Sequence, residues 1–364
     1  MKVSDEVLTN PQIAELLAVA AEGATAPLDR AYRRASRKAL LWPEEVANLL
    51  QDGRSLTELP GVGPYLNKII SRWIESSLAV AKPPHVRANF FTRTEARAIL
   101  RKQPSWAQRL GGDLQMHTLW SDGSASVQEM AEAGELRGYQ YIAITDHSKG
   151  LKIAGGINEE KLEQQGREIA SVNAALEATG RSIRVLRSIE VNLSPTGEVD
   201  MSADSLKKLD LVLGCFHSSL RKKDDQTERY VAALRNPAIN ILGHPRGRIY
   251  NFRLGLTADW SKVFSIAAEL DKAVEIDCYP DRQDMSLDLV KLARKVGCRV
   301  SLGTDSHGAS QLEFIEFGLA AALKAKIDPE RILNFMSRED LLNWAKQKRP
   351  LTRGKSALSS QLVA

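Results

Sequence analysis

Seven short, nearly continuous apolar runs alternate with helical stretches over residues 112–345. They are DLQMHT, YIAITDHS, RVLRSIEVNL, LVLGCFHSS, INILGHPRG, AVEIDCYP and RVSLGTDSH. Runs without polar alternation are typical of parallel strands that helices cover on both faces. The pattern therefore predicts an α/β fold whose strands form a barrel-like sheet.

Histidines and acidic residues stand where these runs end. Five of the six histidines lie there, and only His85 lies elsewhere. In an α/β barrel the carboxyl ends of the strands converge on one end of the barrel, its mouth, and the catalytic residues of such folds lie there. One histidine at a strand end would be taken as structural, but five of them, joined by Glu190 and Asp305, favour a metal site. Imidazoles mixed with carboxylates suit zinc, manganese or iron.

Residues 10–77 have helical periodicity instead. Asn10 followed by Pro11 predicts a helix start, with Asn10 as the cap. A second helix places its cations at offsets 0, 3, 4, 7 and 8, which is one helix face; they are Arg30, Arg33, Arg34, Arg37 and Lys38. This cationic stripe is either a solvated face or a surface for an acidic partner, and no carboxylate interrupts it.

The stretch LPGVG, with Gly61 and Gly63, separates two short helical patterns. Glycines allow a tight turn and leave free N–H groups at the start of the next helix, where an anion can bind. The stretch resembles a helix-hairpin-helix motif, which grips a nucleic-acid backbone, although a plain connector would also fit. With the cationic stripe and Lys68 nearby, it favours a DNA-binding domain over residues 1–77.

Residues 10–77 also resemble the small amino-terminal domain of family X DNA polymerases. In some members of that family the helix after the hairpin carries a lyase lysine. Here Ile69 stands in that register, beside Lys68. Lyase activity is therefore not expected.

The strand-end motifs QMHT with SDG, TDH, FHS, GHP and TDSH, together with Glu190, resemble those of the PHP (polymerase and histidinol phosphatase) domain. The resemblance implies a distorted (β/α)7 barrel with up to three divalent ions, manganese first and zinc or iron as alternatives. It implies catalytic roles for Glu190, Asp305 and His307, and it implies metal ligands at His117, Asp122, His147, Glu190, His217, His244, Asp305 and His307.

The nearest likeness is to the PHP domain at the carboxyl end of bacterial family X polymerases. It predicts a PHP domain over residues 112–345, a linker over 78–111 and a flexible basic tail over 346–364. The linker is too short for a polymerase palm, so nucleotide polymerisation is not expected.

Gln115 is where the sequence departs from the family. PHP domains commonly have His-x-His at this point, whereas here Gln115 precedes His117 by two residues. Residues two apart on a strand point to the same face. A glutamine offers a neutral carbonyl oxygen, which weakens zinc relative to manganese. Gln115 is therefore expected either to coordinate a metal weakly or to orient a bound water.

The functional hypothesis is a metal-dependent phosphoesterase acting on DNA, as a 3′–5′ exonuclease or as an abasic-site or 3′-end processing nuclease in repair. Candidate phosphate clamps at the barrel mouth are Arg221, Lys222, Arg246 and Arg248. The alternatives are a small-molecule phosphomonoesterase of the histidinol-phosphatase type and a non-catalytic DNA-binding protein. The net charge of +5 agrees with a polyanionic partner. The amino terminus lacks an apolar signal core, so a cytoplasmic location is expected.

Overall fold

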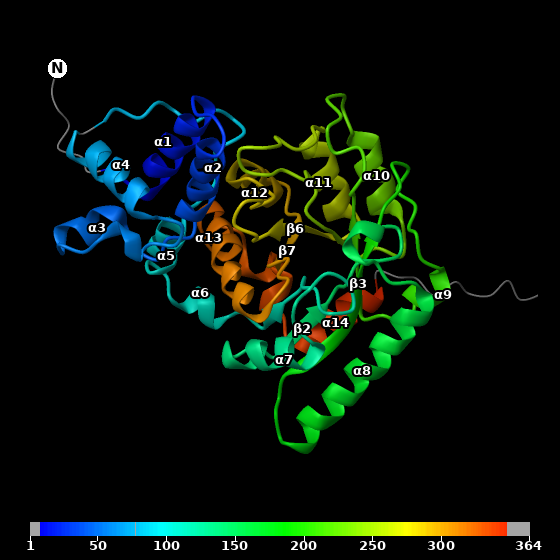
Figure 1. The fold of residues 1–364 in the computed structure, drawn as a ribbon. Helices are drawn as coiled ribbons and strands as arrows, with labels where there is room; N and C mark the ends of the chain where they lie inside the picture. Colours follow the sequence, from blue (N-terminus) through cyan, green and yellow to red (C-terminus); the bar gives the residue numbers. More distant parts are fainter. Residues whose placement is uncertain (1–7, 77, 348–364) are drawn as a thin grey trace, which may run out of the picture.

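The structure is a computed structural model that describes residues 8–76 and 78–347. Figure 1 shows a bundle of helices formed by the amino-terminal part of the chain, beside a larger α/β body. Of the basic tail predicted over 346–364, all but the first two residues lie outside the described part. Within that part, no helix combines the length and the apolar character that a membrane span requires.

The amino-terminal bundle has its own apolar core. Leu17, Trp42, Leu49, Leu56 and Ile70 are fully buried in it. The elements of the bundle are α1 (Asn10–Glu22), α2 (Leu28–Ala39), α3 (Val46–Gln51), η1 (Leu56–Glu58) and α4 (Pro64–Glu75).

The predicted cap of the first helix is wrong by one residue. Thr9 is the cap, and its N–H is bonded to the Gln12 side chain at 2.8 Å. Asn10 is instead the first helical residue, and its buried amide donates to the Glu44 carbonyl and accepts from the Val46 N–H. This side chain links α1 to the start of α3, because a buried amide is stable only when its hydrogen bonds are made.

The segment expected as a linker, residues 78–111, contains two helices. They are α5 (Arg93–Leu100) and α6 (Ser105–Gln108). Arg93 and Arg97 of α5 both form ion pairs with Glu316, at 2.9 Å each. Glu316 lies on α13 (Ile315–Ala325), so this segment is packed along the α/β body.

Seven parallel strands form one sheet in sequential order, as the apolar runs predicted. Their order is β1-β2-β3-β4-β5-β6-β7, and a parallel bridge between Met116 and Ser306 joins the two edges near the mouth. The α/β fold with a barrel-like sheet is therefore confirmed. The strands are β1 (Gly112–Asp113), β2 (Tyr141–Ile144), β3 (Arg184–Asn192), β4 (Leu211–Cys215), β5 (Ile241–Leu242), β6 (Ala273–Asp277) and β7 (Arg299–Gly303).

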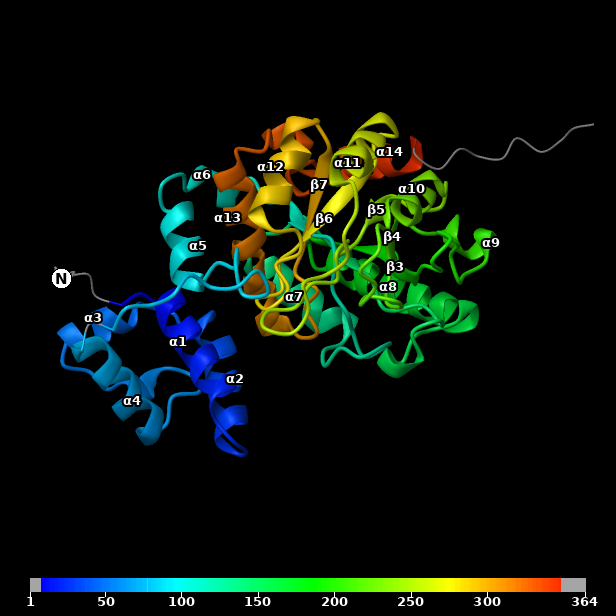
Figure 2. The same cartoon turned by 90° about the horizontal axis from the view of Figure 1, so that it is seen from above.

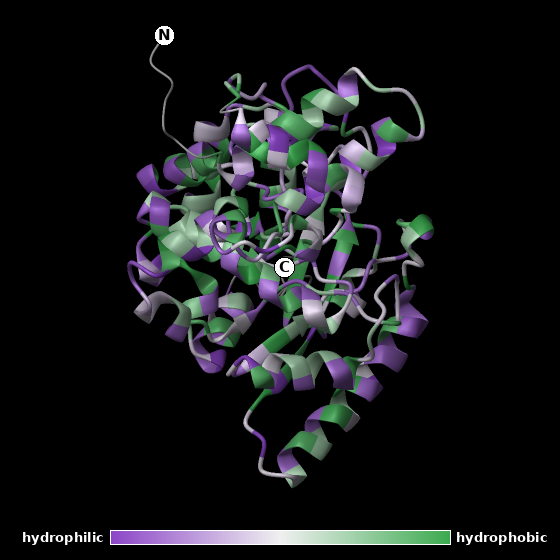
Figure 3. Cartoon of the chain, turned by 60° about the vertical axis from the view of Figure 1, so that its left-hand side comes forward, coloured by the Kyte–Doolittle hydropathy of each residue, from purple (hydrophilic) through white to green (hydrophobic). Residues whose placement is uncertain are grey.

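Helices cover the outside of the sheet. Hydrophobic and hydrophilic positions alternate along the helices in Figure 3, as expected for helices that pack on one face only. These helices are α7 (Val127–Leu136), α8 (Glu159–Ala178), α9 (Ala203–Leu206), α10 (Thr227–Arg235), α11 (Trp260–Glu269), α12 (Leu287–Lys295), α13 and α14 (Arg338–Gln347). Short 3₁₀ turns occur at η2 (Lys152–Ala154), η3 (Ala309–Phe314), η4 (Pro329–Arg331) and η5 (Leu333–Phe335).

The bundle is held against the barrel by a small set of buried contacts. Tyr250, in the loop after β5, packs into the core of the bundle, and its hydroxyl lies 3.1 Å from the Ser36 hydroxyl of α2. Arg87 forms a bidentate ion pair with Glu15 of α1, with both N–O distances at 2.8 Å, and also bonds the Asn251 side chain. Figure 2 shows the resulting arrangement, with α1 and α2 beside the loops of the α/β body.

We expect Arg87→Met to destabilise the protein by about 3–5 kcal/mol, because it leaves the buried Glu15 carboxylate without its partner. The matched control is Arg54→Met. Arg54 pairs with Glu44 and Glu58 at the surface, where water screens an ion pair and its loss should destabilise the protein far less. Urea unfolding followed by tryptophan fluorescence measures both losses, and equal losses would contradict a role for the buried pair.

Candidate metal centre

The Glu190 carboxylate lies at the centre of the barrel mouth. It is fully buried in β3 and contacts four imidazoles that arrive from four other strand ends. The nitrogen-to-oxygen distances are 3.4 Å to His117, 3.7 Å to His147, 2.8 Å to His217 and 3.0 Å to His244. Four ligand-type side chains thus converge on one carboxylate.

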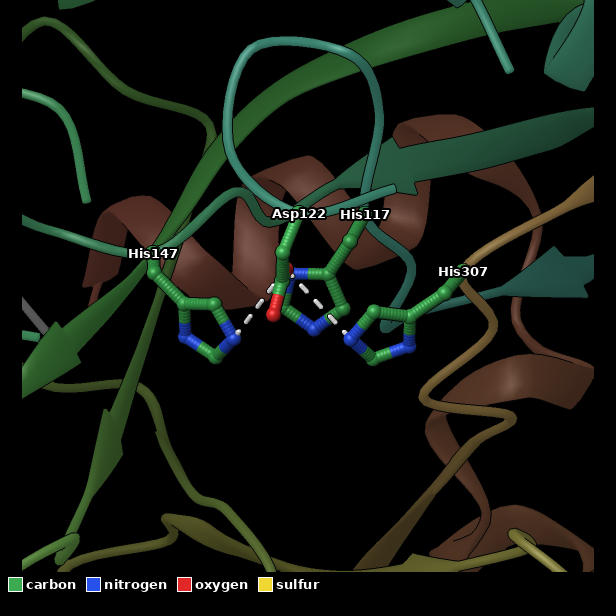
Figure 4. Close-up of side chains that lie close together, drawn as sticks. All are labelled: His117, Asp122, His147 and His307. Carbon is green, nitrogen blue, oxygen red and sulfur yellow. Dashed lines mark ion pairs between the residues drawn. The ribbon is translucent and has the colours of Figure 1, made fainter. Parts of the chain in front are cut away.

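A second cluster lies beside it and is drawn in Figure 4. Asp122, in the loop after β1, lies between two imidazoles, 3.6 Å from His147 and 3.4 Å from His307. His117 completes the group, and the four ligand atoms all lie within 4.8 Å of one another. His117 also lies 2.9 Å from Asp305, which forms a further cluster with Glu190.

The structure thus brings all eight ligands implied by the resemblance to the barrel mouth. They come from the loop after β1 or from the ends of β2, β3, β4, β5 and β7. Cys215, at the end of β4, forms another cluster with Glu190 and His244, and the sequence analysis did not include it. A cysteine inside an apolar run gives no signal, because most such residues are buried structural thiols.

The local backbone fixes the direction of these side chains. His147 forms a parallel bridge with Glu190, so β2 and β3 set their spacing. Asp305 has a left-handed φ of 51°, which turns the chain directly after β7. The buried Asp146 carboxylate bonds the N–H and hydroxyl of Thr118 and the hydroxyl of Ser121, and it thereby holds the loop that carries Asp122.

The pKa values of two histidines of the site are shifted in opposite directions. Burial, together with the neighbouring His117, lowers the pKa of His147 to about 3, so this imidazole is neutral at pH 7. Burial alone would also lower the pKa of His244, but the Glu190 carboxylate outweighs it and raises that pKa to about 10. Although burial favours the protonated carboxyl, the surrounding histidines hold the pKa of Glu190 well below its usual value.

These residues fit divalent metal ions. The neutral His147 has lone pairs to offer, and its Nδ1, like that of His117, is buried without a hydrogen-bond partner. Imidazole nitrogens and carboxylate oxygens in this mixture are ligands for zinc, manganese and iron. A cation between Glu190, Asp305 and the histidines would replace the charge that protonated imidazoles supply in its absence.

Arg282 is a residue that the sequence analysis missed. It follows β6, and its guanidinium bonds the Asp305 carboxylate and lies 3.9 Å from Asp277. Burial opposes ionisation of Asp305, but Arg282 and His117 overcome it and lower the pKa of Asp305. An arginine in a loop between a strand and a helix carries no sequence signal of this role, since only the tertiary fold brings it to the neighbouring strand end.

Gln115 lies in the site in an arrangement that the sequence analysis did not foresee. Its side chain is fully buried, and the amide NH₂ donates to Glu190 at 2.9 Å. Its carbonyl oxygen is buried without a hydrogen-bond partner. Gln115 therefore steadies the central carboxylate and keeps one free acceptor at the floor of the site.

The candidate DNA contacts form two groups, and neither group includes a metal ligand. The stripe on α2 lines a cavity of its own, described below, and Gly61 packs against Lys38, since a Cβ there would lie 3.2 Å from Lys38 Cγ. Gly63 caps α4, and Lys68 is exposed on that helix. Arg221 and Lys222 are exposed after β4, and Arg246 is partly buried after β5.

The structure argues against Arg248 as a phosphate clamp. The residue is buried, its guanidinium donates to the carbonyls of Arg282 and Asn89, and it lies 3.7 Å from the centre of the Phe90 ring. Burial lowers the pKa of Arg248 to about 10. Its hydrogen bonds hold the loop after β5 against residues 89–90, which leaves little of the guanidinium for a ligand.

The fold and the ligand set define the class as an α/β barrel that holds divalent metal ions at its mouth. Residues 113–284 match the family model of the PHP domain, so the chain contains a PHP domain. The expected resemblance is confirmed, and the class is that of metal-dependent phosphoester hydrolases.

Individual relatives cover different parts of the chain. The DNA polymerase/3′-5′ exonuclease PolX of Bacillus subtilis is 35% identical over 240 residues, which is 66% of this chain and 41% of that protein. The chain thus spans less than half of that relative. A "probable phosphatase" of Thermoanaerobacter sp. (strain X514) is 26% identical over 61% of this chain and 89% of its own length. Histidinol phosphate phosphatase of Lactococcus lactis, solved with zinc, L-histidinol and phosphate, has a TM-score of 0.43 and 17% identity, covering 60% of this chain and 94% of its own.

We expect Glu190→Gln to abolish phosphoesterase activity and to lower metal affinity by more than the ~10–100-fold typical of a lost residue that only orients a ligand. The reason is that the variant removes the negative charge of the carboxylate that four imidazoles contact. Metal content after dialysis and hydrolysis of a small phosphodiester measure the two effects, with circular dichroism to verify the fold. The control is Glu228→Gln, whose side chain is 79% exposed on α10. Normal metal content and rate in Glu190→Gln would contradict the metal-site assignment.

A further prediction concerns Gln115. If the unpaired side-chain oxygen of Gln115 coordinates a metal ion, the native protein should hydrolyse its substrate fastest with manganese. The reason is that an amide oxygen suits a harder ion better than zinc. Gln115→His should raise zinc affinity and narrow the preference for manganese. Metal titration of the chelator-stripped proteins, read as occupancy and hydrolysis rate, tests this. Identical occupancies and preferences in the two proteins would mean that Gln115 acts only through its hydrogen bond to Glu190.

Proposed function

We propose that this protein is a metal-dependent phosphoesterase that processes DNA, as a 3′–5′ exonuclease or as a nuclease for abasic sites and 3′ ends. One observation carries the proposal. A cavity of about 460 Å³ has the stripe on α2, Arg30, Arg33, Arg34, Arg37 and Lys38, as one wall and Tyr279, Pro280 and Asp281 as another. The next residue, Arg282, bonds the metal-site carboxylate of Asp305.

In this proposal the α2 cations bind the DNA, and the opposite wall of the cavity belongs to the loop that carries Arg282. A DNA backbone bound by the α2 cations would pass the loop after β6, and that loop leads directly into the site. Contacts of this kind are made to the phosphate backbone of the DNA and do not depend on its base sequence. The 3′-5′ exonuclease named for the Bacillus subtilis relative is compatible with the same arrangement.

The metal ions and the side chains of the protein would have different roles in the reaction. Divalent ions, when bound, polarise phosphoryl oxygens and lower the pKa of a bound water. The chain would hold them through Asp122, Glu190, Asp305 and the five histidines of the mouth. Arg282 offsets the negative charge of Asp305 and keeps that carboxylate ionised.

A small-molecule phosphomonoesterase is the alternative, because the same metal centre serves both substrates. The "probable phosphatase" of Thermoanaerobacter matches 61% of this chain, which agrees with a catalytic unit that works on its own. A small soluble ester, however, gives no reason for five cations on α2 to line a cavity at the mouth. A non-catalytic protein is disfavoured, because all eight ligands are present.

We expect the double variant Arg34→Glu, Arg37→Glu to weaken DNA binding while sparing hydrolysis of a small phosphodiester. The slope of log affinity against log salt should fall by about 2, since two phosphate contacts are lost. The control is Lys161→Glu, Arg167→Glu, which makes the same charge change at exposed positions on α8, at the far end of the molecule from α2 (Figure 1). Equal salt slopes in the two double variants would refute a DNA-binding role for the stripe.

A further inference from the structure

A second and larger cavity lies on another side of the barrel mouth. Its volume is about 680 Å³, within the range of ~300–1,000 Å³ typical of ligand pockets. Its walls come from residues 85–90, from the loop after β4 and from the loop after β5. Neither the metal ligands nor the α2 stripe line it.

The lining of this cavity is strongly cationic. None of the described residues that line it is Asp or Glu, whereas six are basic: Arg221, Lys222, Lys223, Arg246, Arg248 and Arg253. Arg246 and Arg253 use part of their guanidinium groups to bond backbone carbonyls of the same loop. Burial lowers the pKa of Arg253, and the neighbouring cations Arg282 and Arg221 lower it further. Arg221, Lys222 and Lys223 are exposed at the rim.

Large apolar side chains stand exposed among these cations. Phe252 is 55% exposed and Leu254 is 53% exposed, although both lie in a well-folded loop. The Arg221 guanidinium carbon lies 5.3 Å from the centre of the Phe252 ring. An aromatic ring with a neighbouring guanidinium is the combination on which an unpaired nucleic-acid base stacks.

The cavity adjoins the metal centre along the chain. Arg246 follows His244 by two residues, which a chain spans in about 7 Å, and Leu220 follows His217 by three. A ligand could therefore place a phosphate at the metal site and its neighbouring nucleotide here. A base in the interior of a duplex already has both faces stacked, whereas an unpaired base has a face free for Phe252.

We propose that this cavity binds a nucleotide of single-stranded DNA next to the phosphate that is cleaved, with its base stacked on Phe252 and its backbone held by Arg221, Lys222 and Lys223. This inference rests on the proposed DNA-processing function and narrows its substrate to an unpaired strand. A small phosphomonoester has no base to place on the exposed ring.

The experiment removes the Phe252 ring from the protein and the bases from the DNA, each independently of the other. Phe252→Ala and the wild type, both full-length and loaded with manganese, are titrated with two fluorescein-labelled phosphorothioate strands of equal length, which resist hydrolysis. One strand is oligothymidylate, and the other consists of base-free tetrahydrofuran residues. Fluorescence anisotropy gives the affinities.

We expect Phe252→Ala to weaken binding of oligothymidylate by about fivefold or more, from the lost stacking, and to leave binding of the base-free strand unchanged. Phe252→Trp should restore the preference for the strand with bases. The matched control is Leu136→Ala, which removes an apolar side chain that is 90% exposed on α7, and it should change neither affinity.

Equal weakening of both strands by Phe252→Ala would mean a structural role for the ring, and no weakening of either would mean no contact; each result overturns the inference. Loss of binding in Arg34→Glu, Arg37→Glu with no effect of Phe252→Ala would overturn this nucleotide site alone. If the wild type bound neither strand, the proposed DNA-processing function would itself be wrong.

Discussion

The charge of one buried carboxylate governs the rest of the barrel mouth. Glu190 is fully buried in β3, and a buried charge is stable only when paired and hydrogen-bonded. Four imidazoles and the Gln115 amide supply those partners. These partners come from the ends of four strands, since Gln115 and His117 both follow β1, so the parallel sheet must bring these ends to β3 for the carboxylate to remain ionised. The same requirement makes the site suitable for divalent cations.

The position of the helical bundle is the second constraint on function. α2 faces the barrel because Tyr250 and Arg87 hold the bundle in place from the barrel side. The stripe of α2 would otherwise be a solvated helix face, and its cations share a cavity with Tyr279 and Asp281 only because of this docking. Under the proposed function, the contacts that stabilise the interface would therefore also position the α2 cations for substrate binding.

The two cavities give the mouth an unusual distribution of charge. The metal centre is rich in carboxylates, while the α2 wall and the loops after β4 and β5 are cationic. Under the proposed function, both cationic walls would attract a polyanion toward the barrel mouth. Arg282 lies at the boundary, bonded to Asp305 on one side and, through its carbonyl, to Arg248 on the other.

The sequence by itself was enough to predict the barrel and the gathering of metal-ligand residue types at its mouth. Continuous apolar runs that alternate with helical stretches favour buried parallel strands, and the polar residues near their carboxyl ends are then expected at the mouth, so His117, His147, Glu190 and His244 could be placed without coordinates. These are local patterns, read one strand at a time. The helical stripe was equally local, because helix geometry alone puts its cations on one face.

Tertiary structure decided which residues meet across elements. Asn10 looked like a helix cap but bonds the start of α3, Arg248 looked like a phosphate clamp but is buried on Phe90, and Arg282 gave no signal yet pairs with Asp305. The long polar side chains of Arg248 and Arg282 reach partners far away in the sequence, and the buried guanidinium of Arg248 is stable only because it finds them. The periodicity of the sequence does not identify such partners, because the packing of the whole chain determines which residues lie next to each other.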